Sequence, residues 1–140
     1  MEIDINEKNI SIEESVEILN HFFNMKDLNT EHAYFIGFDS KSNIVGIFLV
    51  SAGTVNKCFF YRRNIATFLI LSGTESFALY HNHPNGTLEV SENDKNSLMS
   101  IEVLADTLEV NFIDSVIISK NGWRIIKGER IFDYEEDDEF

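Results

Sequence analysis

The sequence has little cysteine and no long apolar run, and each shortage excludes a class of protein. A single cysteine among 140 residues, Cys58, cannot form an internal disulfide or a thiolate metal site. No apolar run approaches the roughly 18 to 20 residues that a membrane-spanning helix needs. Glu2 and Asp4 stand where a secretory signal would carry bases. We therefore expect a cytoplasmic protein without a membrane segment, in which Cys58 is a small buried residue.

Positive charge is also scarce. The chain has 11 Lys and Arg against 24 Asp and Glu, for a net charge of −13, and six of the acids lie in the last eight residues. Such a chain repels phosphate backbones, and it shows no stripe of Lys and Arg. Direct binding of nucleic acid is therefore not expected. The composition leaves the oligomeric state open.

Apolar residues are plentiful, at 44% with twelve Phe, which is enough to build the core of one domain. A capping-box pattern at Ser11, followed by apolar residues at spacings of three and four, predicts a helix from there to about Lys26. Residues 31–39 and 44–51 read as two apolar strands separated by a polar turn. These two strands predict an antiparallel hairpin.

The remaining pattern alternates helices and strands. In chain order it predicts a short strand at 55–60, a helix at 61–71 capped by Ser72-Gly73, a strand at 76–80, a helix of about five turns from Ser91, a strand at 112–118 and its antiparallel partner at 123–126. The expected architecture is an α/β sandwich of three layers, with a mixed sheet between helices. We divide the chain into a lead-in and helix at 1–29, a main domain at 30–132 and a disordered acidic tail at 133–140.

A cluster of polar residues follows the predicted strand at 76–80. His81 and His83 are two positions apart, so on an extended backbone they point the same way. Ser91 and Asp94 lie one turn apart at the start of the next helix, where both can face the histidines. Two imidazoles and a carboxylate with a fourth position open are the ligand set of a catalytic zinc site. Ser91 and Asp94 taken alone would more simply form a capping box, and the upstream histidine pair is what favours the metal site.

The whole string is H-x-H-P, then S-x-x-D, with seven residues between the second histidine and the serine. It resembles the JAMM (MPN+) metalloprotease motif, and its His-Asn-His-Pro-x-Gly form resembles the RadC branch of that family. The resemblance implies the JAB/MPN fold, which is cytidine-deaminase-like, and zinc-dependent hydrolysis of peptide or isopeptide bonds. The substrates so implied are proteins or peptides, such as ubiquitin-like conjugates. By the same resemblance Zn²⁺ is held by His81, His83 and Asp94, and the Ser91 hydroxyl stabilises the oxyanion.

The resemblance also selects a catalytic glutamate among the many acids. RadC-type domains begin their first core strand with a Glu followed by aromatic and aliphatic residues, and Glu31 matches that position. Glu31 is therefore expected to take the proton from the metal-activated water, with Glu89 in the loop as the second candidate. A strand-edge surface charge is the plainer interpretation of Glu31. His32 beside it is expected to be structural or exposed rather than a ligand.

Four positions depart from the RadC pattern, and they put the substrate preference in doubt. Asn85 stands in place of the usual Ser, Val90 and Arg62 in place of Pro, and Ser115 in place of His. The competing interpretation is a non-catalytic RadC-like interaction module, linked to DNA repair without direct DNA binding. A third interpretation, that the chain belongs to another class of metallohydrolase, has less support. A metallo-β-lactamase requires Asp-His after the histidine pair, and an amidohydrolase barrel requires about 250 residues.

Overall fold

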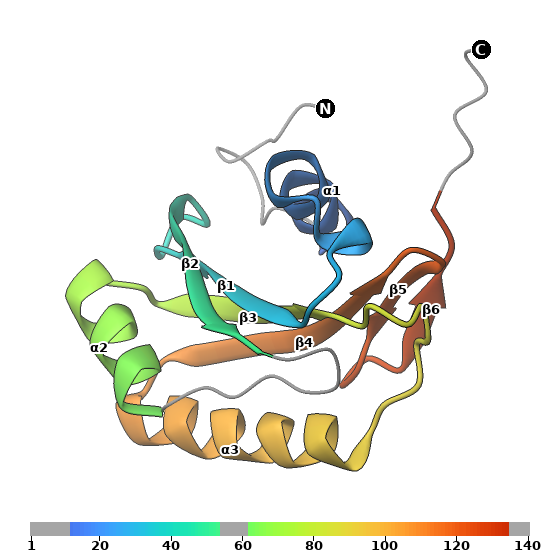
Figure 1. The fold of residues 1–140 in the computed structure, drawn as a ribbon. Coiled ribbons are helices and arrows are strands. Elements are labelled where there is room, and N and C mark those ends of the chain that lie inside the picture. Colours follow the sequence, from blue (N-terminus) through green and yellow to red (C-terminus); the bar gives the residue numbers. More distant parts are fainter. Residues whose placement is uncertain (1–11, 54–61, 135–140) are drawn as a thin grey trace.

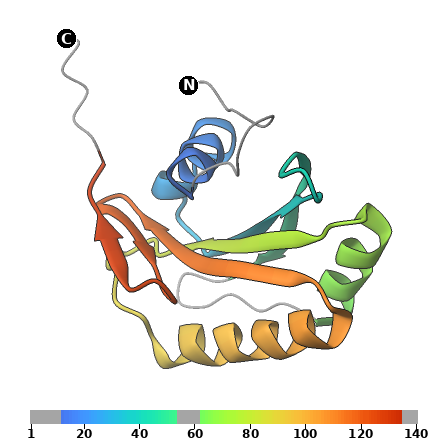
Figure 2. The ribbon, with the colours of Figure 1, turned by 180° about the vertical axis from the view of Figure 1, so that it is seen from behind.

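The computed structural model describes residues 12–53 and 62–134, and within them it shows a six-stranded mixed sheet between helices (Figures 1 and 2). The strand order is β2-β1-β3-β4-β5-β6, and only β3 and β4 run parallel. The helix α3 joins that parallel pair, as a crossover connection requires. The elements are α1 (Ile12–Phe23), η1 (Met25–Asp27), β1 (His32–Phe38), β2 (Ile44–Ala52), α2 (Arg62–Ser72), β3 (Ser76–Asn82), α3 (Glu92–Leu108), β4 (Asn111–Ser119), β5 (Gly122–Ile125) and β6 (Arg130–Phe132).

The sheet is covered on both faces, which confirms the predicted three-layer α/β architecture. Helix α1 lies on one face, and α2 and α3 lie on the other (Figure 1). Leu19 of α1 packs with Tyr80, whereas Ile65 of α2 and Ile101 of α3 pack with Phe35 on the opposite side. Side chains alternate between faces along each strand, so a central strand buried on both sides must be apolar throughout. Each such buried side chain stabilises the fold by about 1.5–3 kcal/mol.

Most predicted elements are present within the described residues. The hairpin of β1 and β2, the helix α2, and the antiparallel pair of β4 and β5 agree with the predictions. Gly73 follows α2 with φ of 70°, as expected for a glycine that ends a helix. The predicted strand at 55–60, with Cys58, and residues 135–140 of the predicted tail lie outside the described residues. Tyr134, at the start of that tail, donates its hydroxyl proton to the Ser119 carbonyl at 2.5 Å.

One detail of the predicted fold was wrong, and one strand was missed. The first helix ends at Phe23 rather than near Lys26, because Asn24 adopts the left-handed conformation with φ of 54°, which asparagine tolerates better than most residues. The short turn η1 then places Met25 in the core with none of its surface exposed. Burial of Met25 gives a physical reason for the break. The sequence also did not reveal β6, whose three residues are too few to show a pattern.

Gly122 provides a test of the hairpin geometry. It has φ of 146°, and a Cβ there would lie 2.3 Å from the carbonyl oxygen of Phe132 on the neighbouring strand. We expect Gly122→Ala to lower the free energy of unfolding by about 1–3 kcal/mol. Gly73→Ala is the matched control, because its φ of 70° is also positive but no atom of the described residues would lie within 4 Å of the added Cβ. Urea denaturation of both variants checks this, and a Gly122→Ala protein no less stable than Gly73→Ala would contradict it.

Among the described residues, no helix combines the length and the apolar character needed to cross a bilayer.

Candidate metal centre

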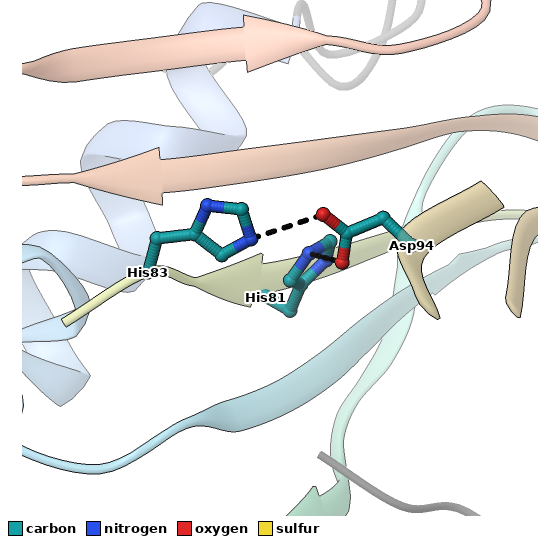
Figure 3. A group of neighbouring side chains, drawn as sticks. All are labelled: His81, His83 and Asp94. Atoms are coloured by element: carbon teal, nitrogen blue, oxygen red, sulfur yellow. Dashed lines mark hydrogen bonds and ion pairs between the residues drawn. The ribbon is translucent and has the colours of Figure 1, made fainter. Parts of the chain in front are cut away.

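The two histidines of the predicted site lie side by side at the end of β3. His81 is in the strand and His83 is one residue beyond it, so both side chains leave the same face of the sheet. Their ring centroids are 5.1 Å apart at an interplanar angle of 62°. Both residues are buried, as is Asp94 on the first turn of α3, which points between them (Figure 3).

Asp94 contacts both imidazoles at once. Its Oδ1 lies 2.9 Å from His81 Nε2, and its Oδ2 lies 3.1 Å from His83 Nε2. Asp94 also takes part in a capping box, in which its Oδ2 accepts from the Ser91 N–H at 2.9 Å and its own N–H donates to Ser91 Oγ at 3.0 Å. The two interpretations of Ser91 and Asp94 are therefore compatible, since the cap is what aims the Asp94 carboxylate at the histidines.

Protons hold this cluster together when no metal is bound. His83 Nδ1 lies 3.1 Å from the Thr87 carbonyl, and because a carbonyl oxygen only accepts, Nδ1 carries a proton. Burial alone would lower the pKa of His83, but the hydrogen bond and charge of Asp94 outweigh it and raise the pKa above the usual 6.5. Burial likewise opposes ionisation of Asp94, yet the hydrogen bonds from His81 and His83 hold its pKa well below the ordinary 3.8. The metal-free cluster therefore favours an ion pair between the Asp94 carboxylate and protonated His83, and the same carboxylate accepts a hydrogen bond from His81 Nε2.

The same donor set fits a divalent metal ion. One ligand atom from each of His81, His83 and Asp94 can be chosen so that all three lie within 4.8 Å of one another. Ligands placed tetrahedrally around zinc at about 2.0–2.1 Å lie about 3.3 Å apart, so a small inward shift of the side chains is enough. The hydrogen bond from His83 Nδ1 to Thr87 leaves Nε2 free to bind metal once its proton is lost.

Glu31 is buried beside this cluster rather than displayed at the strand edge. Only 6% of its surface is exposed. It lines a cavity of about 190 Å³ together with His83, Ser91 and Asp94, and a second cavity of about 10 Å³ together with His81 and Asp94. Burial raises the pKa of Glu31 above the usual 4.5, while the charges of His81 and His83 oppose the rise. A carboxylate with a raised pKa beside the candidate ligands is well placed to exchange protons.

The other predicted side chains have different surroundings. Glu89 is exposed but lines the larger cavity, so it remains a second candidate for proton transfer. Ser91 is exposed on the same cavity, with its oxygen occupied as the helix cap. His32 Nδ1 forms a hydrogen bond with the Thr30 carbonyl oxygen at 2.9 Å. His32 is not part of the candidate ligand group. The roles assigned to Glu31 and Ser91 stay predictions.

One residue of the site was missed in the sequence. Asn82 lies between the two histidines and points to the opposite face, with 1% of its surface exposed. Its Nδ2 donates to the Thr30 carbonyl at 3.0 Å, and its Oδ1 accepts from the His32 N–H at 2.6 Å. These bonds hold the backbone on both sides of Glu31. The sequence did hold a signal for this role: Asn82 ends a mostly apolar strand, and an amide that is buried needs hydrogen-bond partners.

Three of the four departures from the RadC pattern face the candidate site. Asn85 and Val90 line the larger cavity, and Ser115 lines the smaller one. Arg62 instead begins α2 and is exposed. The departures therefore alter the walls of the cavities and leave the candidate ligands intact.

Comparison with known proteins agrees with this geometry. A family model described as the RadC-like JAB domain matches residues 11–131, which is most of the chain. The chain belongs to this family. Similar relatives are UPF0758 proteins from Pelodictyon phaeoclathratiforme, 29% identical over 96 residues, and from Staphylococcus epidermidis, 30% identical over 97; each alignment covers 69% of this chain and 43% of the relative. This RadC-like JAB domain thus spans less than half the length of the curated relatives it matches, and their names state no activity.

The ion pair gives the RadC-like JAB domain a specific pH dependence. Without metal, the raised pKa of His83 stabilises the fold below about pH 6.5, and that contribution is lost as the pH rises through the folded-state pKa. The lowered pKa of Asp94 contributes above about pH 3.9 and is lost on acidification. A divalent metal ion such as zinc, if held by these residues, would have to displace the imidazole protons, so its stabilising effect would grow as the pH rises. Thermal melts between pH 5.5 and 8.5 should therefore show the added stability from zinc increasing with pH, and a constant increment would contradict this.

Proposed function

We propose that the chain is a zinc-dependent hydrolase of peptide or isopeptide bonds. The observation that carries this proposal is the convergence of His81, His83 and Asp94 beside a cavity that the buried Glu31 also lines. A capping box alone would need neither the histidine pair nor a buried glutamate. Two imidazole nitrogens and one carboxylate suit zinc, although other divalent metals accept the same donors.

The side chains divide the work of hydrolysis among them. Zinc held by His81, His83 and Asp94 would lower the pKa of a coordinated water to about 7. Glu31, with its pKa raised by burial, accepts a proton at its carboxylate and returns it to the leaving amine. Ser91 uses its oxygen to cap α3 and keeps its hydroxyl proton, which it donates to the developing oxyanion.

The substrate class that we propose is a protein or peptide, including an isopeptide to a lysine of a ubiquitin-like conjugate. Among the described residues, no Lys or Arg lines the larger cavity, whereas Glu31, Glu89 and Asp94 do. An acidic wall favours a leaving group that becomes a cationic amine over one that carries negative charge. The altered residues Asn85 and Val90 in the same wall support a substrate preference different from that of other RadC-like domains.

Metal analysis tests the site directly. Protein purified without added metal is expected to contain about one zinc per chain, and the His83→Ala variant is expected to contain little. The same zinc content in both proteins would show that the site is assigned wrongly. Cleavage of a panel of peptides and lysine isopeptides by the zinc-loaded chain then tests the reaction. A zinc-loaded chain that cleaves none of them would favour the non-catalytic interaction module.

A further inference from the structure

The loop between β3 and α3 carries His83 and forms much of the wall of the larger cavity. The sheet holds the start of the loop, where the His83 N–H donates to the Ile118 carbonyl at 2.9 Å and the Gly86 N–H donates to the His83 carbonyl at 3.0 Å. Beyond Gly86 the loop leaves the sheet and crosses to α3 without regular structure. Its position there depends on contacts with other parts of the molecule.

Two side chains from the β4–β5 hairpin make such contacts. Asn121 Nδ2 donates to the Gly86 carbonyl at 2.9 Å, and Arg124 Nη1 donates to the Leu88 carbonyl at 3.2 Å. Thr87 lies between these two anchored residues, and its carbonyl accepts the proton of His83 Nδ1 at 3.1 Å. The hairpin therefore holds the carbonyls of Gly86 and Leu88, which flank the Thr87 carbonyl that orients the His83 ring.

The contact between hairpin and loop is close and locally braced. Gly86 has φ of 87°, and a Cβ there would lie 2.8 Å from Asn121 Nδ2, so the glycine lets the loop approach the turn. The Asn121 N–H donates to Ser119 Oγ at 3.0 Å, which fixes the turn itself. Arg124 is half-buried, and its Nε is buried without a hydrogen-bond partner among the residues that the structure describes. An arginine usually keeps its charged end in water, so this placement sacrifices solvation for the contact with the loop.

We propose that Asn121 and Arg124 are positioning residues for the metal centre. By fixing the carbonyls of Gly86 and Leu88 they hold Thr87 where it binds His83 Nδ1, and so they set the tautomer and the ring orientation that present Nε2 to the metal. Partners of ligating histidines act in this way, and their loss typically weakens metal binding by about 10- to 100-fold. This inference rests on the proposed metal site and adds two residues that are 38 and 41 positions from His83 in the chain.

Zinc competition against a chromophoric chelator, together with the absorption spectrum of the cobalt-substituted protein, tests the inference. Asn121→Ala and Arg124→Gln are each expected to weaken zinc binding by about 10-fold, and the double variant by up to about 100-fold, with altered cobalt bands. Arg124→Lys keeps a donor on a flexible stem and should recover part of the affinity. The matched controls are Asn111→Ala, at the far end of β4, and Arg130→Gln, on the edge strand β6; both should bind zinc like the wild type.

The outcomes separate this inference from the proposed function. Wild-type protein that binds no zinc would overturn both. Zinc bound by the wild type with unchanged affinity and cobalt spectrum in the variants would overturn the positioning role alone. A purely structural role would lower the melting temperature of the metal-free variants and leave the cobalt spectrum of the folded protein unchanged, which also counts against the inference. If the double variant does not fold, the single variants and Arg124→Lys decide the matter.

Discussion

Asp94→Asn is expected to weaken zinc binding by more than about 100-fold, beyond the loss of a partner that only orients a ligand. Asparagine keeps the shape of the side chain and one acceptor oxygen, so the helix cap with Ser91 can persist. The change removes the negative charge that faces both imidazoles at 2.9 and 3.1 Å. We also expect the metal-free protein to lose about 1–3 kcal/mol of stability, because two buried histidines lose their anionic partner.

Glu92→Gln is the matched control for this result. Glu92 lies on the same first turn of α3, and its side chain is 83% exposed and paired with Lys95. The control removes the same charge from the same end of the helix, so it separates ligation from a general effect of charge on zinc affinity. Isothermal titration and thermal melts of both variants make the comparison. Wild-type zinc affinity in Asp94→Asn would exclude Asp94 as a ligand.

Glu31→Gln should lower the rate of hydrolysis by about 100- to 10,000-fold, which is the usual contribution of a general base. Glutamine fills the same buried space and keeps hydrogen-bonding ability, but it cannot accept the proton. Because Glu31 is not expected to touch the metal, zinc content should stay at the wild-type level. Turnover of a peptide or isopeptide substrate that the wild type cleaves, measured beside zinc content, provides the test.

Glu89→Gln is the control for proton transfer, since Glu89 lines the same cavity but is exposed. We expect it to retain most of the activity, with an effect confined to substrate affinity. A large loss of turnover in Glu89→Gln with little loss in Glu31→Gln would assign the role of general base to Glu89 instead. Equal activity of both variants and the wild type would leave neither glutamate with a catalytic role.

Local patterns predicted which side chains form the candidate metal group. The spacing of His81 and His83 determined that they share a face, and the interval from Ser91 to Asp94 predicted the helix cap. In contrast, the choice of Glu31 among 24 acids came from resemblance rather than from any local pattern. The fold places Glu31 beside the histidines because Ala33, two residues along, pairs with His81 across β1 and β3, and the same antiparallel register leads from there toward Glu31 and His83.

The fold shows the same division between local and distant contacts. Strong apolar patterns predicted the central strands and α3, whose ends agree within a few residues. The end of α1 was wrong, because the break at Asn24 serves the burial of Met25 against strands that come later in the chain. The three residues of β6 pair with β5 and have no periodicity of their own.

Neighbouring residues alone specified the candidate ligand group, since the geometry of a strand and of a helix start is repetitive and can be read over a few positions. The order of strands in the sheet, by contrast, specified which distant residues support those ligands. It brings Asn82 against the backbone around Glu31, and it brings Asn121 and Arg124 against the loop that carries His83. Such contacts join residues 35 to 52 positions apart, and packing of the whole domain creates them.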